Sequence, residues 1–136
     1  MNRQRLDDIG RLILRLAVGG LMFFHGVAKL AHGVDRIGGQ LAQHGVPRFV
    51  SLGVYIGEVV APLALILGIG SRIAGVVVVV NMLVAISLSH VADLARLTRG
   101  GGWGVELQML YLFGAASIAL LGAGRFSVSR GRGRFD

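Results

Sequence analysis

Five ionisable side chains stand inside stretches of sequence that are otherwise apolar: His25, Lys29, Glu58, His90 and Glu106. Near neutral pH, a histidine or a carboxylate can exchange a proton with a bound molecule or form a hydrogen bond to it. An ionisable group inside a bilayer costs roughly 2.5–3.5 kcal/mol on insertion scales, so a set of them rarely persists without a use. We therefore take Glu58 and His25 as candidate catalytic residues, and Lys29, His90 and Glu106 as candidate ligand-binding residues.

Four apolar blocks, each close to the length of a membrane span, carry these residues: 12–30, 49–69, 73–88 and 103–121. The hydrocarbon core of a bilayer takes roughly 20 helical residues. Because backbone polar groups find no water in lipid, blocks of this length are expected to be helices. The sequence predicts an all-α integral membrane protein, a bundle of four transmembrane helices at about 10–30, 49–69, 72–91 and 103–122. This domain covers 1–126, and the basic tail at 127–136 is expected to be disordered.

The amino-acid composition also indicates an integral membrane protein. Hydrophobic residues make up 54% of the 136 residues and charged residues 15%, whereas a soluble domain carries about 25% charged residues. The apolar content also argues against a disordered nucleic-acid-binding chain, although the net charge is +7. There is no cysteine, which excludes disulfides, thiol exchange, iron–sulfur ligation and cysteine-based zinc sites.

The basic residues predict an orientation. With four spans both termini lie on one side, which carries nine of the 14 lysines and arginines: Arg3, Arg5, Arg11, Arg15, Arg72, Arg125, Arg130, Arg132 and Arg134. The other five lie on the opposite side: Lys29, Arg36, Arg48, Arg96 and Arg99. Because cytoplasmic loops carry the basic excess, the termini are expected to face the cytoplasm. Arg11 and Arg15 are expected to extend to that surface.

This topology places the five candidates in the outer half of the membrane. His25 and Lys29 are four residues apart and so share a helix face. Glu58 lies about nine residues, or about 13 Å, from the outer boundary. Pro62 removes the hydrogen bond that the Glu58 carbonyl would accept, so the second helix is expected to kink and leave that carbonyl free beside the carboxylate.

The same residues also allow a purely structural interpretation, in which Glu58 pairs with Lys29 or His25 and Glu106 pairs with His90, only to hold helices together. A single metal ion held by the histidines and glutamates is chemically allowed. The spacing shows no Glu-x-x-His pattern, however, and we expect no metal.

Three further features bear on packing and processing. Asn81, midway along the third block, is expected to form a hydrogen bond between helices. Gly53 and Gly57 have the spacing of a helix-packing motif. Asp7 and Asp8 precede the first apolar block, and this pattern is unlike a cleaved signal peptide, so we expect the block to be retained.

Several short motifs, in their order along the chain, resemble the DoxX family of small bacterial membrane proteins. They are FHGVAKL at 24–30, HGVP at 44–47, Glu58 ahead of an aliphatic run ending LGI at 67–69, Arg72, His90, and GAGRFS at 122–127. The last motif more often reads Gly-Pro-Gly in the family, and Ala123 stands here in place of the proline. The resemblance covers roughly 12–127.

The resemblance implies a four-helix protein of the bacterial inner membrane associated with redox complexes, such as a quinone-reducing oxidoreductase or an assembly that handles thiol stress. We expect a redox membrane subunit that binds a quinone or similar apolar ligand in an outer-half polar cavity. His25 or His90 would donate a hydrogen bond to a carbonyl oxygen, and Glu58 would exchange protons beside Lys29.

Other functions stay open. One is a non-enzymatic membrane anchor or assembly factor for partner proteins, and a less favoured one is passage of a small solute or protons. The expected partners are the lipid bilayer and soluble or membrane redox proteins, and not nucleic acid. The sequence leaves a homo-oligomer open.

Overall fold

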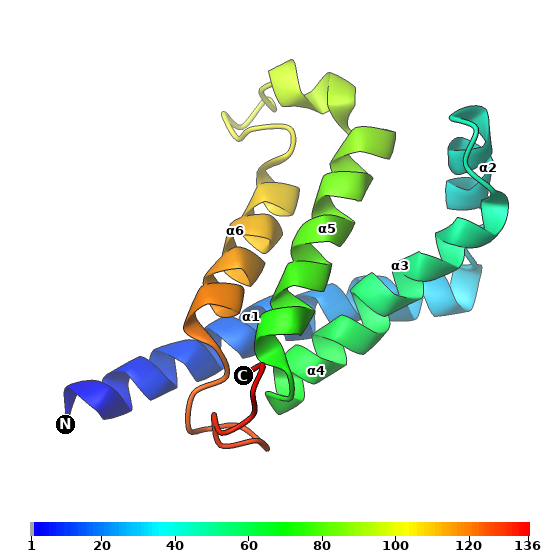
Figure 1. Cartoon of the computed structure of the whole chain (residues 1–136). Coiled ribbons are helices and arrows are strands. Elements are labelled where there is room, and N and C mark those ends of the chain that lie inside the picture. Colours follow the sequence, from blue (N-terminus) through cyan, green and yellow to red (C-terminus); the bar gives the residue numbers. More distant parts are fainter. Residues whose placement is uncertain (1) are drawn as a thin grey trace.

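The computed structural model describes residues 2–136 and is built from helices (Figure 1). In chain order they are α1 (Arg3–His32), α2 (Asp35–Gln43), the 3₁₀ turn η1 (Arg48–Leu52), α3 (Gly53–Tyr55), the π-helical turn η2 (Ile56–Val60), α4 (Ala61–Leu67), α5 (Ser71–Ser89), the 3₁₀ turn η3 (Val91–Ala95) and α6 (Glu106–Leu121). An isolated antiparallel bridge joins Leu97 to Trp103 in the loop before α6.

Three of these helical stretches are long and apolar enough to cross a membrane: Arg3–His32, Arg48–Leu67 and Ser71–Ser89. The second is a single rod made of η1, α3, η2 and α4. The fourth, α6, is apolar but shorter, with 16 residues, or about 24 Å at 1.5 Å per residue. The molecule is therefore an all-α membrane bundle of three long spans and one shorter one.

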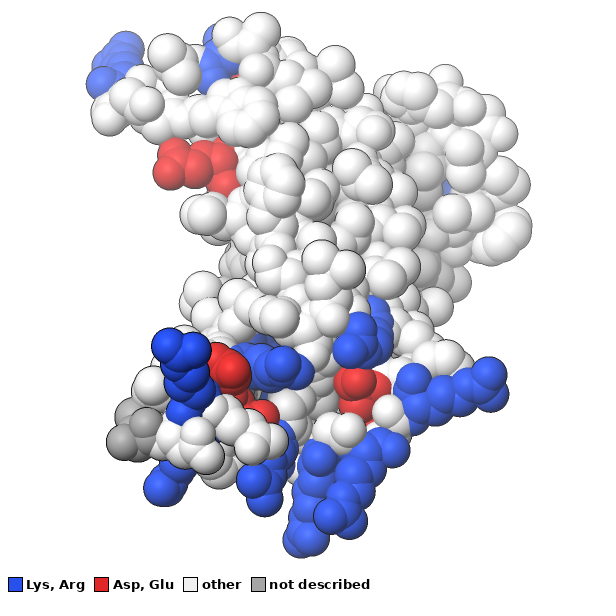
Figure 2. Space-filling model, turned by 60° about the vertical axis from the view of Figure 1, so that its left-hand side comes forward, with Lys and Arg blue, Asp and Glu red and all other residues white. Residues whose placement is uncertain are grey.

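The bundle has two ends. Figure 1 shows α5 and α6 side by side, with α1 crossing them and the rod of α3 and α4 lying along α1. We call the end that holds the start of α1, the α4–α5 turn and residues 122–136 the terminal end, and the end that holds α2 and η3 the loop end. In Figure 2 most Lys and Arg atoms gather at the terminal end, below a broad uncharged surface.

The core lies where α1, α4, α5 and α6 meet, around Met22, Leu65, Val78 and Ile118. Small residues let the helix backbones approach. A Cβ on Gly75 of α5 would lie 2.7 Å from the Ala115 carbonyl oxygen of α6. Such close packing drives helix association in lipid, where the solvent offers no hydrophobic gain.

The α4–α5 turn depends on two glycines. Gly68 and Gly70 have φ of 71° and 57°, in the left-handed region that only glycine adopts without cost. The Ile69 N–H donates to the Ala64 carbonyl at 3.0 Å, and this bond closes α4 in the manner of a Schellman motif. The turn reverses the chain, so that α5 runs back towards the loop end.

Arginines bind the carbonyl groups at the terminal end. Arg15 is 1% exposed, and its guanidinium donates to the carbonyls of Leu65 and Phe126 at 2.9 Å and 3.0 Å and also to that of Ala123. Arg11 donates to the Leu121 carbonyl. The sequence predicted that both would extend to the membrane surface. The Arg15 guanidinium does reach the terminal end, but it is buried there, because unpaired carbonyls at the end of α4 and after α6 surround it.

The segment 122–136 returns to this end of the bundle. The Val128 N–H donates to the Leu67 carbonyl at 2.9 Å, and the Ser129 hydroxyl donates to the Gly68 carbonyl at 2.7 Å. The Asp136 carboxylate accepts from the N–H groups of Gly70 and Ser71 at 2.5 Å and 3.4 Å. The sequence predicted disorder for 127–136, whereas the structure shows turns held by these bonds.

Candidate functional site

Glu58 lies in the middle of the rod, in the π-helical turn η2, and its side chain is buried at 4% exposure. Its Oε1 accepts a hydrogen bond from Lys29 Nζ of α1, which also makes it an ion pair, and a second one from Asn81 Nδ2 of α5 at 3.3 Å. Its Oε2 is buried and has no hydrogen-bond partner among the described residues. One carboxylate oxygen is therefore engaged in two hydrogen bonds, and the other has no hydrogen-bond partner among the described residues.

The π-helical turn follows from Pro62, which comes four residues after Glu58 and cannot donate a backbone hydrogen bond. Turns of this kind are often found at functional sites. The sequence predicted that the freed carbonyl would lie beside the carboxylate. In the structure the Glu58 carbonyl faces α1, where a Cβ placed on Gly26 would lie 2.0 Å from its oxygen, and the carboxylate meets Lys29 of the same helix.

Two glycines make room for the buried group. Gly26 lets α1 approach the Glu58 backbone, which brings Lys29 within reach of the carboxylate. On the other side, a Cβ on Gly57 would lie 2.6 Å from Asn81 Oδ1, so Gly57 allows Asn81 to approach. The position of the ion pair therefore depends on close backbone contacts as well as on the charged side chains.

A cavity of about 350 Å³ adjoins the ion pair and opens towards the loop end. We call it the Glu58 cavity. Its polar lining includes Lys29, Glu58, Asn81, Arg36, Gln40 and His90. The Ser89 hydroxyl of α5 donates to Gln40 Oε1 of α2 at 3.2 Å, so α2 covers the cavity and joins its two walls.

A second hollow of about 310 Å³ lies between η1, α3, η2 and α5, and its lining is almost entirely apolar. We call it the valine groove, because Val50, Val76, Val77, Val80 and Val84 line it together with Gly53 and Gly57. Asn81 and Val84 line both the groove and the Glu58 cavity. A polar space and an apolar space therefore adjoin each other at these two residues.

The structure brings together three of the five candidates from the sequence. Lys29 and Glu58 form the ion pair, and His90 lines the same cavity while its Nδ1 lies 3.0 Å from Asp93 Oδ2. The Lys29 side chain is 29% exposed, so it is partly open at the edge of the cavity.

His25 and Glu106 lie elsewhere. On α1, with about 100° per residue, His25 and Lys29 lie only about 40° apart. The His25 ring nevertheless packs against α6, where it meets the Tyr111 ring edge-on at 5.8 Å between centroids. Glu106 is exposed and lies over Gly102 in the loop before α6. In residues 2–136, no three His, Asp or Glu side chains gather in a way that could hold a metal ion.

From the sequence, we did not predict that residues of α2 would line the Glu58 cavity. Buried Val34, Gly38 and Leu41 recur at the helical spacing i, i+4, i+7. That pattern predicts an amphipathic helix in the loop after the first span. Arg36 and Gln40 lie on this helix, so the pattern was the available signal for them as candidate site residues. Asn81 was expected to form an interhelical hydrogen bond, and the structure shows that its partner is the carboxylate of Glu58.

The arrangement suits a ligand with a polar headgroup and an apolar tail. Glu58 Oε2 can accept a hydrogen bond or a proton, whereas Lys29, Arg36 and His90 can donate. Hydrogen bonds to a charged group contribute about 1.5–3 kcal/mol each, so one bond to the buried carboxylate would distinguish ligands that donate from those that do not.

Comparison with known proteins gives one family. The family model described as DoxX matches residues 10–91. The searches of curated proteins and of solved structures gave no match. The matched range contains all the polar residues named above for the Glu58 cavity, whereas Glu106 and the segment 122–136 lie outside it. Because the match covers more than half of the chain, this multi-pass membrane protein belongs to the DoxX family.

Proposed function

We propose that this chain is a membrane subunit of a redox system of the bacterial inner membrane, and that its Glu58 cavity binds the headgroup of a quinone or quinol. The observation that carries the proposal is the buried Oε2 of Glu58, which has no protein partner, beside a polar cavity. The adjoining valine groove fits the aliphatic tail of such a ligand.

Each residue has a role in this proposal. Glu58 accepts a hydrogen bond and then a proton at Oε2, while Lys29 and Asn81 hold Oε1 and fix the carboxylate. His90 donates a hydrogen bond from the edge of the cavity. Oxidation of a bound quinol to the quinone releases two protons and two electrons. One proton passes to Glu58 Oε2 and the other to water at the mouth of the cavity, and both electrons pass to a partner protein of the redox system.

The test is binding of a short-chain benzoquinol with one isoprenoid unit to the purified chain in detergent micelles, measured by calorimetry under anaerobic conditions. We expect Glu58→Gln to weaken binding at least ten-fold, because the hydrogen bond to a charged acceptor is lost. Glu106→Gln is the matched control, since this carboxylate is exposed and outside the cavity, and it should leave the affinity unchanged.

Two results would contradict the proposal. One is the absence of saturable binding to the wild-type chain. The other is an equal effect of the Glu58 and Glu106 substitutions, which would mean that the ligand senses overall charge and not the buried carboxylate.

One observation favours a second function, a membrane anchor or assembly factor without catalysis. The bonds from Lys29 and Asn81 to Glu58 join α1, the rod and α5, which is what a structural staple would do. This function predicts that Glu58→Gln lowers the amount of folded protein in the membrane and of co-purifying partner proteins in proportion, with no quinol binding in either chain.

A further inference from the structure

The arginines of the terminal end fall into two groups. Arg11, Arg15 and Arg72 donate to backbone carbonyls, Arg72 to those of Leu120 and Asp136 at 2.7 Å and 2.9 Å. The second group has no such partners. Within residues 2–136, the guanidinium groups of Arg5, Arg125, Arg130 and Arg132 form no salt bridge and no hydrogen bond.

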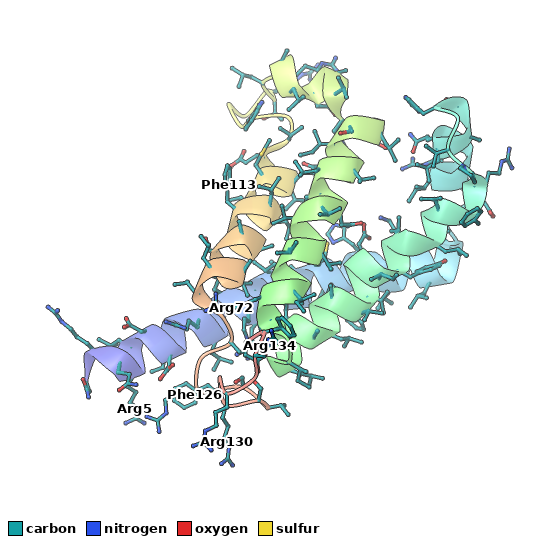
Figure 3. All side chains as sticks on the ribbon, in the orientation of Figure 1. Arg5, Arg72, Phe113, Phe126, Arg130 and Arg134 are labelled. Carbon is teal, nitrogen blue, oxygen red and sulfur yellow. The ribbon has the colours of Figure 1, made fainter. Side chains whose placement is uncertain are left out.

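These four arginines line one cavity of about 660 Å³, between the first turns of α1 and the segment 125–132. We call it the arginine cavity. Figure 3 shows Arg5, Phe126 and Arg130 close together at the terminal end. Asp8 is the single carboxylate in the lining, and its Oδ1 already accepts a hydrogen bond from the Arg125 N–H at 3.0 Å. Four cations around one engaged carboxylate form a site for an anion.

The cavity lies at the depth of lipid headgroups. With 30 residues, α1 is about 45 Å long at 1.5 Å per residue, whereas the hydrocarbon core is about 30 Å thick. Even with the usual tilt of a spanning helix, α1 extends beyond the core. Because α1 reaches the loop end at His32, its first turns at the terminal end enter the headgroup region.

We propose that the arginine cavity binds the phosphodiester headgroup of an anionic phospholipid. Guanidinium groups suit phosphate because their paired N–H donors match its oxygens. Apolar residues next to the arginines favour lipid over a nucleic acid or a free anion: Leu6, Phe126 and Val128 are 48%, 43% and 67% exposed. Side chains of this kind cover acyl chains at a bilayer interface.

The test measures lipid binding to the purified full-length chain in detergent by native mass spectrometry. The probes are phosphatidylglycerol, which is anionic, and phosphatidylcholine, which has no net charge. The wild-type chain should bind the first phosphatidylglycerol more tightly than phosphatidylcholine. The variant Arg5→Gln/Arg130→Gln should weaken the first binding step by about 30-fold, at roughly 1 kcal/mol for each arginine.

A matched variant separates a defined site from general attraction. Arg3→Gln/Arg134→Gln removes the same charge from the same two segments, but neither residue lines the cavity. Because charges outside the cavity are screened by salt, the affinity of this variant should stay within about three-fold of wild type. Thermal unfolding checks that each variant is folded. The comparison of the two lipids uses the wild-type chain alone, so it does not depend on the folding of any variant.

Three outcomes would overturn the proposal: equal affinity for the two lipids, an equal loss in the two variants, or displacement of the lipid by a soluble anion. For the last, excess inorganic phosphate and a uridylate dodecamer are added separately, each at an ionic strength matched with sodium chloride. Displacement by phosphate would indicate a site for a free anion, and displacement by the dodecamer would indicate a nucleic-acid surface.

Discussion

At the scale of single residues, the feature that organises the site is an ion pair shared by two helical segments in a largely apolar bundle. Such pairs have an asymmetric energetic effect. Forming one roughly balances desolvation against attraction, but removing one partner leaves a buried charge and costs about 3–5 kcal/mol. Glu58 is in this position, because its exposure is only 4% and Lys29 is its one cationic partner within residues 2–136.

We therefore expect Lys29→Met to lower the free energy of unfolding by about 3 kcal/mol. In the double variant Lys29→Met/Glu58→Gln no unpaired charge remains, so part of the loss should be regained. The measurement is denaturant unfolding in mixed micelles, with Glu106→Gln expected to change stability by less than about 0.5 kcal/mol. A double variant less stable than Lys29→Met alone would rule out an ion pair at this site.

Asp136 gives a prediction about pH. Burial alone would raise the pKa of this carboxyl, but the nearby Ser129 side chain and hydrogen bonds from the N–H groups of Gly70, Ser71 and Gly133 outweigh burial and hold the pKa below its usual value of 3.8. The docked segment therefore favours the ionised carboxylate. The resulting stabilisation is fully present above pH 3.8 and is lost as the pH falls through the lower pKa of the folded state.

A spin label on Arg132→Cys can measure this, because the chain has no other cysteine. The label should be restrained at pH 7 and become mobile only as the pH falls below 3.8, through the lower pKa of the folded state. With Asp136→Asn it should be mobile at both pH values, whereas Asp7→Asn, an exposed position, should behave as the wild type. A label that is equally mobile at pH 7 in wild type and in Asp136→Asn would show that this carboxylate does not hold the segment.

At the scale of helical elements, the approach of α1 to the π-helical turn depends on Gly26. Gly26→Ala would place a Cβ 2.0 Å from the Glu58 carbonyl oxygen, so the two segments must separate. We expect a loss of about 2–3 kcal/mol of stability, together with loss of quinol binding, because overpacking forces a backbone shift.

The control is Gly20→Ala on the same helix, where a Cβ would have no neighbour within 4 Å. Alanine has the higher helix propensity, so this change should be neutral or slightly stabilising. Both variants are compared by thermal unfolding in micelles. An equal response of the two would mean that α1 does not pack closely on η2.

Much of this architecture could be predicted from the sequence, because lipid imposes one strong rule. Apolar blocks of sufficient length must be helices, and this is why even the five consecutive valines at 76–80 lie in α5. Side-chain direction was harder to predict. His25 and Lys29 satisfy the i, i+4 rule, yet Lys29 is long enough to reach Glu58 while His25 meets Tyr111.

Two other features depend on contacts that no local pattern encodes. The position of Arg36 and Gln40 over the cavity depends on how α2 packs against η1 and on the bond from Ser89 of α5 to Gln40. The burial of Arg15 depends on carbonyls from α4 and from the segment after α6, which lie 50 and 111 residues away along the chain.

At the scale of the whole molecule, the uneven distribution of arginines bears on orientation. The terminal end carries most of the basic residues (Figure 2), and we predict that this end faces the cytoplasm. Single cysteines at Arg99 and Ser129 can test this in intact cells with a membrane-impermeant maleimide. Residue 99 should be labelled and residue 129 should react only after lysis. The reverse pattern would mean that the terminal end faces outward. Labelling of both residues in intact cells would contradict the prediction that residues 99 and 129 lie on opposite sides of the membrane.

The position of Arg15 also sets an order for biosynthesis. The first span leaves the ribosome with its guanidinium unpaired, and the carbonyls of Leu65 and Ile66 become available only after α4 has been made. The remaining acceptors, Ala123 and Phe126, follow all four spans. A nascent chain that stalls before residue 123 therefore leaves the Arg15 guanidinium with only its acceptors at the end of α4, so the first span is fully paired only once the last residues of the chain have folded back.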